Sequence, residues 1–342
     1  MELNERKLKI LQAIIKDYLT TAEPVGSRTI SKNYNLGISP ATIRNEMSDL
    51  EELGFIVQPH TSAGRIPSDK AYRLYVDTML ELQKAEFGKL VYLDQLLKST
   101  GRIENLLKEI ARLLAQETHY TTFVTTPQYR RAKVKNLQLI DLEEGKLLVV
   151  VVTDTNHIKN RTIRVDSRYD QTVLNRLSFQ LNEQLYNLSL EEIGKERIES
   201  VKQATGEDQI VGKILDALFE IIHEVDDMDI YTSGTTNILH YPEFADLDKA
   251  SALMRSIEER DVFKDILNTT FDLEDGKVKI SIGDENELPD LKACSLITTS
   301  YHIHGERVGA IGIIGPKRMD YYNTVYSLRC LIKNMDELLN RL

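Results

Sequence analysis

Residues 24–45 read PVGSRTISKNYNLGISPATIRN, and this stretch contains no Asp or Glu although the 342-residue chain carries a formal net charge of −10. Double-stranded DNA presents one negative charge per ~1.7 Å of its axis, so a surface that faces DNA must exclude carboxylates. An acid-free segment in an acidic chain therefore indicates a DNA-facing surface at residues 24–45.

Two helix patterns precede a turn in this region. Residues 4–21 predict a helix, because apolar residues recur at spacings of three and four and form one stripe: Leu8, Leu11, Ile15 and Tyr18. A short second helix is expected up to about Asn33, with Ser27 as its N-cap. Asn35 and Gly37 then supply a turn, because both residue types tolerate the left-handed backbone region.

A third helix is predicted over residues 40–53, since Ser39-Pro40 supplies an N-cap followed by proline at the first position, and Gly54 stops the helix. One side of it is apolar and packs on the first two helices: Ile43, Met47 and Leu50. The opposite side is small or polar: Ala41, Thr42, Arg44, Asn45 and Ser48. Because Arg can bridge guanine O6 and N7 and Asn can bridge adenine N6 and N7, this side suits base edges in a major groove.

A β-hairpin follows the third helix. Residues 55–58 predict a strand, residues 61–64 a turn, and Arg65-Ile66 an antiparallel return, after which Ser68 caps a fourth helix. Three helices and a hairpin make a winged helix-turn-helix. Three polar residues of the wing are expected at phosphates or in the minor groove: His60, Ser62 and Arg65.

Pattern alone leaves a protein-interaction module as an alternative, because winged helices also serve that role and a polar face with one Arg is common on solvated surfaces. Net charge does not separate the two readings, since residues 1–80 contain ten Lys+Arg and ten Asp+Glu.

Three longer runs carry a family resemblance. SPATIRNEMSDLEELGFI (39–56) and HTSAGRIPSDKAYRLYVD (60–77) closely resemble the N-terminal domain of the heat-inducible transcription repressor HrcA family. GAIGIIGPKRMDY (309–321) is similar to the C-terminal part of the same family. The resemblance implies a winged helix joined to a GAF-like domain that is interrupted by an inserted dimerising domain.

The rest of the chain predicts a multidomain α+β protein. Residues 81–118 are helical in pattern with an interruption at 99–101, and strands are expected at 120–126, in three segments of 135–165, near 230–239, and at 278–282, 294–302 and 308–314. Helices are expected in 170–225, at 246–260 and at the C-terminus. An antiparallel sheet flanked by helices is the plan of a GAF-like domain. The predicted domains are a winged helix at 1–82, a helical linker at 83–118, a GAF-like domain at 119–133 with 228–342, and an inserted dimerisation domain at 134–227.

Catalytic, cofactor and metal sites are not indicated. The sequence has no Walker loop, HExxH or GxSxG motif, so an enzyme is not expected, nor is a cofactor. Cys294 and Cys330 lack CxxC spacing and are expected to fill core positions, and His302 with His304 are expected to be polar residues near a turn. The longest aliphatic run, residues 147–152, is far shorter than the ~20 residues that span a bilayer. Without a hydrophobic signal core, a cytoplasmic bacterial protein is expected, with no membrane partner and on the nucleoid when bound to DNA.

The resemblance implies a negative regulator of chaperone operons that binds an inverted-repeat operator as a homodimer. It also implies that chaperonin maintains the activity of the regulator and that this activity is lost on heat stress. The alternative is a regulator that senses a small metabolite through its GAF-like domain. The DNA-binding residues expected from the pattern are Thr42, Arg44, Asn45 and Ser48 at base edges or adjoining phosphates, Ser39 at the helix N-terminus, and Arg28, Lys32, His60, Ser62 and Arg65 at the backbone or wing groove.

Overall fold

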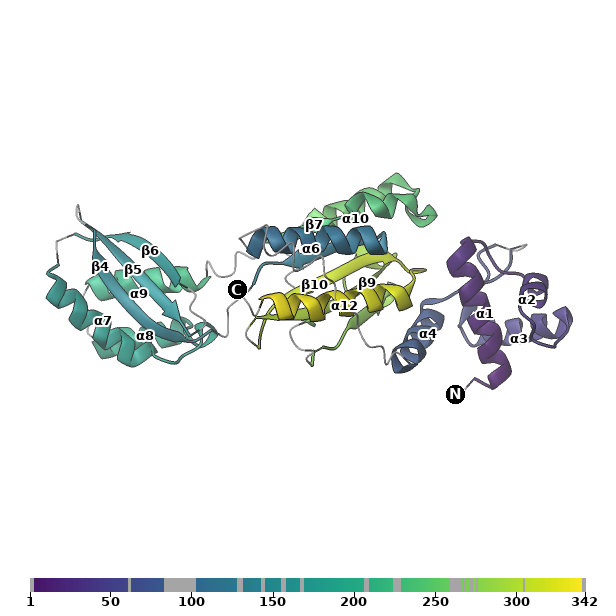
Figure 1. Ribbon diagram of the computed structural model, residues 1–342, viewed down its shortest axis with the longest axis horizontal. Coiled ribbons are helices and arrows are strands. Elements are labelled where there is room, and N and C mark those ends of the chain that lie inside the picture. The colour runs from purple at the N-terminus through teal and green to yellow at the C-terminus, as the bar shows by residue number, and fades with distance from the viewer. Residues whose placement is uncertain are drawn as a thin grey trace. The chain divides into compact units, whose positions relative to one another are not determined.

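The computed structural model describes residues 3–60, 63–82, 103–127, 132–142, 145–154, 158–166, 169–205, 209–223, 229–258, 266, 269–270, 273–274, 276–303 and 305–339. The chain divides into two compact units, residues 1–126 with 230–342, and residues 127–229. The first unit contains an N-terminal winged helix and a larger α+β body, and the second is inserted into that body along the chain (Figure 1). None of the described helices is long and apolar enough to cross a membrane.

The winged helix has the predicted elements. Its helices are α1 (Glu5–Thr21), α2 (Ser27–Asn33), α3 (Pro40–Glu52) and α4 (Asp69–Leu82). Strands β1 (Ile56–Val57) and β2 (Ile66–Pro67) pair antiparallel at the base of the wing. The core of α1 is broader than the predicted stripe, because α1 packs on α2, α3, α4 and β2 together. Leu11 and Ile15 are buried as expected, whereas Leu8 and Tyr18 are only half-buried.

The predicted cap of α2 is wrong by one position. Gly26 is the N-cap, and Ser27 is the first helical residue, with no side-chain cap hydrogen bond. Gly26 takes the extended conformation there, so its backbone alone opens the helix.

The body is built on an antiparallel five-stranded sheet in the order β7-β3-β10-β9-β8. Its strands are β3 (Thr121–Thr125), β7 (Ile230–Ser233), β8 (Lys279–Ile282), β9 (Cys294–Ile303) and β10 (Glu306–Pro316). The expected strand near 230–239 is shorter than predicted. Gly234 has a φ of 67°, which turns the chain into the 3-10 helix η3 (Thr235–His240).

Helices α6 (Ile103–Thr118) and α12 (Tyr321–Leu339) pack on this sheet and on each other, while α10 (Leu247–Glu258) packs at the short turns η4 (Pro242–Phe244) and η6 (Pro289–Leu291). Three apolar residues of α6, Leu107, Ile110 and Leu114, are buried against the sheet, so this side of the helix serves intramolecular packing. Residues 83–102, which include the predicted interruption at 99–101, lie outside the described residues.

Three glycines of β10 allow large rings to cross the sheet closely. A Cβ on Gly309 would collide with Tyr301, one on Gly312 with Phe123, and one on Gly315 would crowd Tyr120. These glycines therefore serve close packing within the sheet.

The second unit pairs a three-stranded antiparallel sheet with helices. The sheet order is β4 (Val134–Asp141), β5 (Lys146–Thr153), β6 (Ile158–Arg164), followed by α7 (Gln171–Leu185), η1 (Leu190–Glu192), α8 (Lys195–Thr205) and α9 (Gln209–His223). The aliphatic run of β5 alternates, with Leu147, Val149 and Val151 buried in the core against the helices. Whether this unit dimerises, and where its domain borders fall, stays a prediction.

Candidate nucleic-acid interface

Helix α3 is set up by the capping residues that the sequence predicts. The Ser39 side chain accepts a hydrogen bond from the N–H of Thr42 at 3.1 Å, and Pro40 occupies the first position, which needs no hydrogen-bond donor. Ile43, Met47 and Leu50 are buried, as predicted. Burial of this side fixes the rotation of α3 and turns its polar side outward.

The outward side of α3 presents unpaired recognition groups. Arg44 and Asn45 are exposed, and neither makes a side-chain hydrogen bond or ion pair within the described part of the chain. Thr42 and Ser48 have local partners, since Thr42 Oγ1 lies 3.0 Å from Ser39 Oγ and Ser48 Oγ donates to the Arg44 carbonyl at 3.3 Å. Two free side chains with donor groups on an exposed helix face are suited to base edges.

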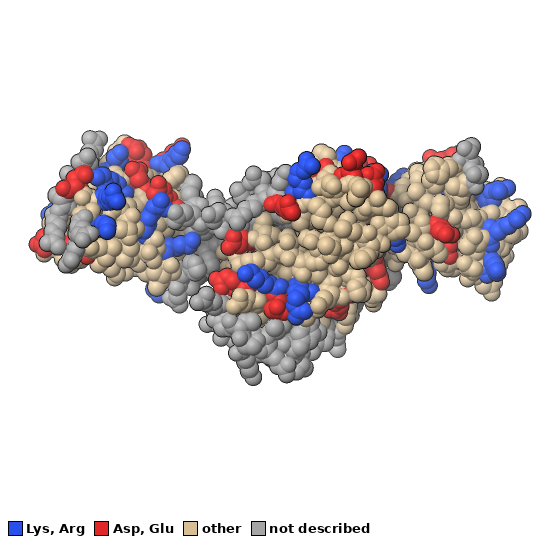
Figure 2. All heavy atoms as spheres, turned by 90° about the horizontal axis from the view of Figure 1, so that it is seen from above, with Lys and Arg blue, Asp and Glu red and all other residues tan. Residues whose placement is uncertain are grey.

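Helix α2 adds two cations beside α3. Arg28 and Lys32 are one helical turn apart and exposed, and no ion pair involves either of them among the described residues. Lys and Arg side chains gather at the end of the winged helix where α2 and α3 lie (Figure 2). An unpaired cation on a solvated face is available to a phosphate.

Two acids of α3, Glu46 and Asp49, are paired with a lysine of the winged helix. Lys7 of α1 lies 2.8 Å from Glu46 and 2.9 Å from Asp49. The hydrogen bonds that the Lys7 ammonium donates to Glu46 and Asp49 raise the pKa of Lys7. The negative charge of this turn of α3 is therefore directed toward α1.

The wing is fastened to the rest of the winged helix at its base. Arg65 exchanges two backbone hydrogen bonds of 2.9 Å with Val25, and its guanidinium lies on Glu51 at 2.8 Å. A Cβ on Gly64 would lie 2.6 Å from the backbone of Pro24 and Val25, so the chain approaches too closely there for any other residue.

The remaining wing residues are placed less completely. His60 is exposed, and its carbonyl accepts from the N–H of Ala63 at 2.9 Å to close a turn. Ser62 lies outside the described residues. Sequence patterns did not indicate the ion pair between Glu51 and Arg65, which couples α3 to the wing and leaves Arg65 less free than Arg44 for DNA.

Other candidate sites have structural roles. Cys294 and Cys330 are buried, as predicted, and burial raises the pKa of the Cys294 thiol to about 12. The His302 N–H donates to Asp336 at 2.8 Å, while His304 is not among the described residues. No group of three His, Cys, Asp or Glu residues that could hold a metal ion occurs within the described ranges.

Comparisons with known proteins agree with the interface. The family model "Winged helix-turn-helix transcription repressor, HrcA DNA-binding" matches residues 2–81, and "HrcA protein C terminal domain" matches residues 104–325. A solved crystal structure of a protein described as hypothetical is 24% identical, with a TM-score of 0.61 over 99% of both chains, which shows a shared fold.

Relatives of known name match from end to end. The heat-inducible transcription repressor HrcA of Lachnoclostridium phytofermentans is 47% identical and is matched over 100% of this chain and 99% of its own. That of Alkaliphilus metalliredigens is 40% identical over 99% and 98% of the two chains. These relatives do not favour a metabolite-responsive regulator or an enzyme. The chain belongs to the heat-inducible transcription repressor HrcA family, whose members are DNA-binding regulators.

Proposed function

We propose that this protein represses chaperone operons by binding an inverted-repeat operator as a homodimer, with α3 of each winged helix in a major groove. The observation that carries the proposal is the outward side of α3. Among the described residues Arg44 and Asn45 are free there, and Arg28 with Lys32 lie unpaired on the adjacent α2, whereas Glu46 and Asp49 pair with Lys7 and Glu51 pairs with Arg65.

Each residue has a proposed role within this interface. Arg44, Asn45, Thr42 and Ser48 face base edges or adjoining phosphates, and Ser39 presents the N-terminus of α3. Arg28, Lys32 and His60, with Ser62 and Arg65 of the wing, contact the backbone or the neighbouring groove. An inverted repeat follows from two-fold symmetry of the dimer, because each half-site then meets an identical head.

The body and the second unit have proposed roles as well. The antiparallel sheet with α6 and α12 supports a GAF-like domain, and residues 134–227 would form the inserted dimerisation domain. No cofactor is proposed, and the protein would work in the bacterial cytoplasm at the nucleoid.

Loss of activity on heating follows from the marginal stability of proteins with several domains, for which ~1–2 kcal/mol changes the folded fraction several-fold. The buried β5 run of Leu147, Val149 and Val151 would expose an aggregation-prone strand once the second unit opens. Chaperonin that binds this opened state would refold it to active repressor. On heating, other unfolded proteins would compete for chaperonin and the repressor would stay inactive.

A binding titration tests the proposal. Full-length protein is titrated into a labelled inverted repeat from a chaperone promoter and into a scrambled duplex, at one salt concentration, with and without chaperonin. Selective binding that chaperonin increases after mild heating is expected. Equal binding of both duplexes would mean that the protein binds DNA without sequence specificity. If binding after mild heating recovers equally with and without chaperonin, the proposed role of chaperonin is wrong.

A further inference from the structure

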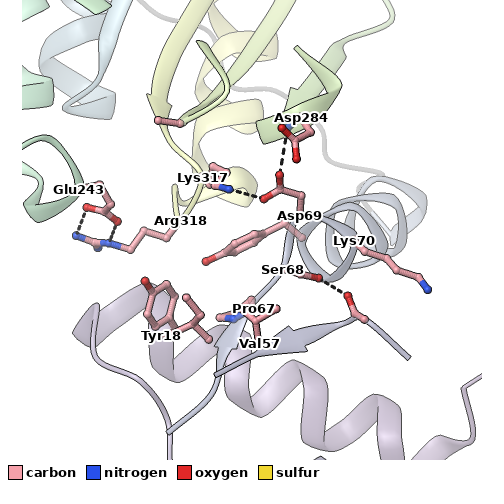
Figure 3. Close-up of a pocket in the computed structure, with 14 residues that line it drawn as sticks. Tyr18, Val57, Pro67, Ser68, Asp69, Lys70, Glu243, Asp284, Lys317 and Arg318 are labelled. Carbon is pink, nitrogen blue, oxygen red and sulfur yellow. Dashed lines mark hydrogen bonds and ion pairs between the residues drawn. The ribbon is translucent and has the colours of Figure 1, made fainter. Parts of the chain in front are cut away.

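The dipeptide Lys317-Arg318, just after β10, joins the body to two helices of the winged helix. Lys317 Nζ lies 2.7 Å from the carboxylate of Asp69, the first residue of α4. Arg318 pairs with Glu243 of the body (Figure 3). Its Nη1 also donates to the carbonyl of Leu19 in α1 at 3.5 Å. The last turn of α1 has no basic residue of its own, so Arg318 supplies the cation that a helix C-terminus favours.

A second group of contacts joins α4 to the turn η5 (Gly283–Glu285). Arg73 Nε donates to Glu285 Oε1 at 2.8 Å, and the backbone N–H of Asp284 donates to Asp69 Oδ2 at 3.1 Å. Glu285 is itself held by the N–H of Ile282 at 2.8 Å. Residues in the first two turns of α4 therefore hold η5 in place.

Gly283 makes this close approach possible. Its φ is +56°, and a Cβ there would overlap the Asp69 carboxylate. A side chain at position 283 would push α4 away from the turn without touching any residue of the outward side of α3.

The joint between winged helix and body is polar and incompletely filled. A pocket of about 430 Å³ remains between Tyr18 and Pro67 on one side and Lys317 and Arg318 on the other (Figure 3). The hydroxyl of Tyr72, which lines this pocket, is buried with no hydrogen-bond partner among the described residues.

The joint leaves the nucleic-acid interface free. Arg28, Lys32, Arg44 and Asn45 are all exposed, and none of them takes part in these contacts. The joint therefore fixes the direction of the head without covering its recognition side.

We propose that a docking cluster positions each winged helix so that the two heads of the dimer accept one spacing of half-sites. Its members are Asp69, Arg73, Gly283, Glu285, Lys317 and Arg318. This inference rests on the proposed dimeric repressor. When each winged helix is held in one orientation, the effective concentration of the second winged helix at its half-site is high. A loosely held winged helix samples many positions, and avidity is lost.

The test measures binding of full-length protein to a duplex with one half-site and to inverted repeats that differ only in spacer length. Gly283→Ala is the main variant. Gly305→Ala is its matched control, because Gly305 also has a positive φ, +81°, but a Cβ there meets nothing within 4 Å. Glu285→Gln is a second, isosteric variant that removes the charge facing Arg73.

Wild type and Gly305→Ala are expected to prefer one spacer length sharply. Gly283→Ala should bind the preferred operator about tenfold more weakly than wild type does, because it loses part of the avidity that comes from linking the two winged helices. It should bind the operators with other spacer lengths nearly as well as the preferred one. Glu285→Gln should shift in the same direction. Affinity for the single half-site should stay unchanged in all four proteins.

Two results would overturn the inference. One is an unaltered spacer preference in both Gly283→Ala and Glu285→Gln. The other is a loss of half-site binding in Gly283→Ala, which would mean that the contact supports the head's own fold. Wild type that does not distinguish an operator from a scrambled duplex would instead overturn the proposed function and this inference with it.

Discussion

The winged helix has two charged faces that differ in whether their charges are paired. On the face of α2 and α3, Arg28, Lys32 and Arg44 make no ion pair within the described residues. On the docking face, Arg73 of α4 pairs with Glu285 of the body, and Asp69 of α4 pairs with Lys317 of the body. The difference teaches that pairing, and not the number of cations, distinguishes a surface open to DNA from one already engaged within the protein.

The same distinction explains why net charge was uninformative. The N-terminal residues 1–80 hold equal numbers of acids and bases, ten of each. Glu46 and Asp49 lie on Lys7, and Glu51 lies on Arg65. Internal pairing neutralises Glu46, Asp49 and Glu51, while Arg44 nearer the start of α3 makes no ion pair within the described residues, which leaves a local positive surface on a neutral domain.

Replacing Arg44 by Ala should give the largest effect on the DNA side. A bidentate contact to a guanine contributes ~1–3 kcal/mol to discrimination, so operator affinity should fall by about ten- to a hundredfold, with relaxed preference at one base pair. Titration against operators mutated at single positions measures this. A uniform loss over all sequences would assign Arg44 to a phosphate.

Replacing Ser39 by Ala should come next, because it removes the N-cap of α3. Loss of such a cap costs about 1 kcal/mol of stability. Ser27→Ala is a matched control, since Ser27 makes no cap hydrogen bond. Chemical denaturation of the two variants should show destabilisation for Ser39→Ala alone, and equal midpoints would mean that Pro40 and core packing set α3 by themselves.

Replacing Lys32 by Ala should weaken all duplexes by a similar, smaller factor. Loss of one phosphate contact should lower the slope of log affinity against log salt by about 0.9. Lys317→Ala, on the docking face, should leave the salt slope for a single half-site unchanged. A change in sequence preference for Lys32→Ala would contradict its assignment to the backbone.

The smallest effect is expected from the titration of Glu285. Burial acts to raise its pKa, but hydrogen bonds from Arg73 and the Ile282 N–H outweigh burial and lower the pKa below its ordinary value. A depressed carboxylate pKa stabilises the docked state above the ordinary pKa, and this contribution disappears as the pH falls through the lowered value. Thermal midpoints of wild type and Glu285→Gln should therefore differ most near pH 7 and converge only as the pH falls through the lowered pKa of Glu285, below the ordinary value for Glu. A gap that is constant with pH would show that the charge of Glu285 does not matter.

Local signals predicted the winged helix well because each was contained in a few residues. Ser39-Pro40 marked the start of α3, and the spacing of Ile43, Met47 and Leu50 fixed its buried side. Errors arose where two neighbouring residues carried similar signals, as with Gly26 and Ser27, or where one residue redirected a strand, as Gly234 does after β7.

Contacts between distant segments could not be predicted from one sequence. Arg73 and Glu285 are 212 positions apart, and nothing in either local pattern marks them as partners. The close approach of Gly64 to Pro24 and Val25 likewise depends on tertiary packing. The outward side of α3 was therefore predictable from the sequence, whereas the contacts that orient the winged helix on the body were not.

Charge reversal on the two faces tests most directly which of them binds DNA. Affinity for a duplex with a single half-site is measured for wild type, Lys32→Glu and Lys317→Glu at one salt concentration. Lys32→Glu should lose most of the binding, because it places an acid on the α2–α3 face, while Lys317→Glu should bind like wild type. Equal losses in both variants, or a loss confined to Lys317→Glu, would contradict the assignment of the α2–α3 face to DNA.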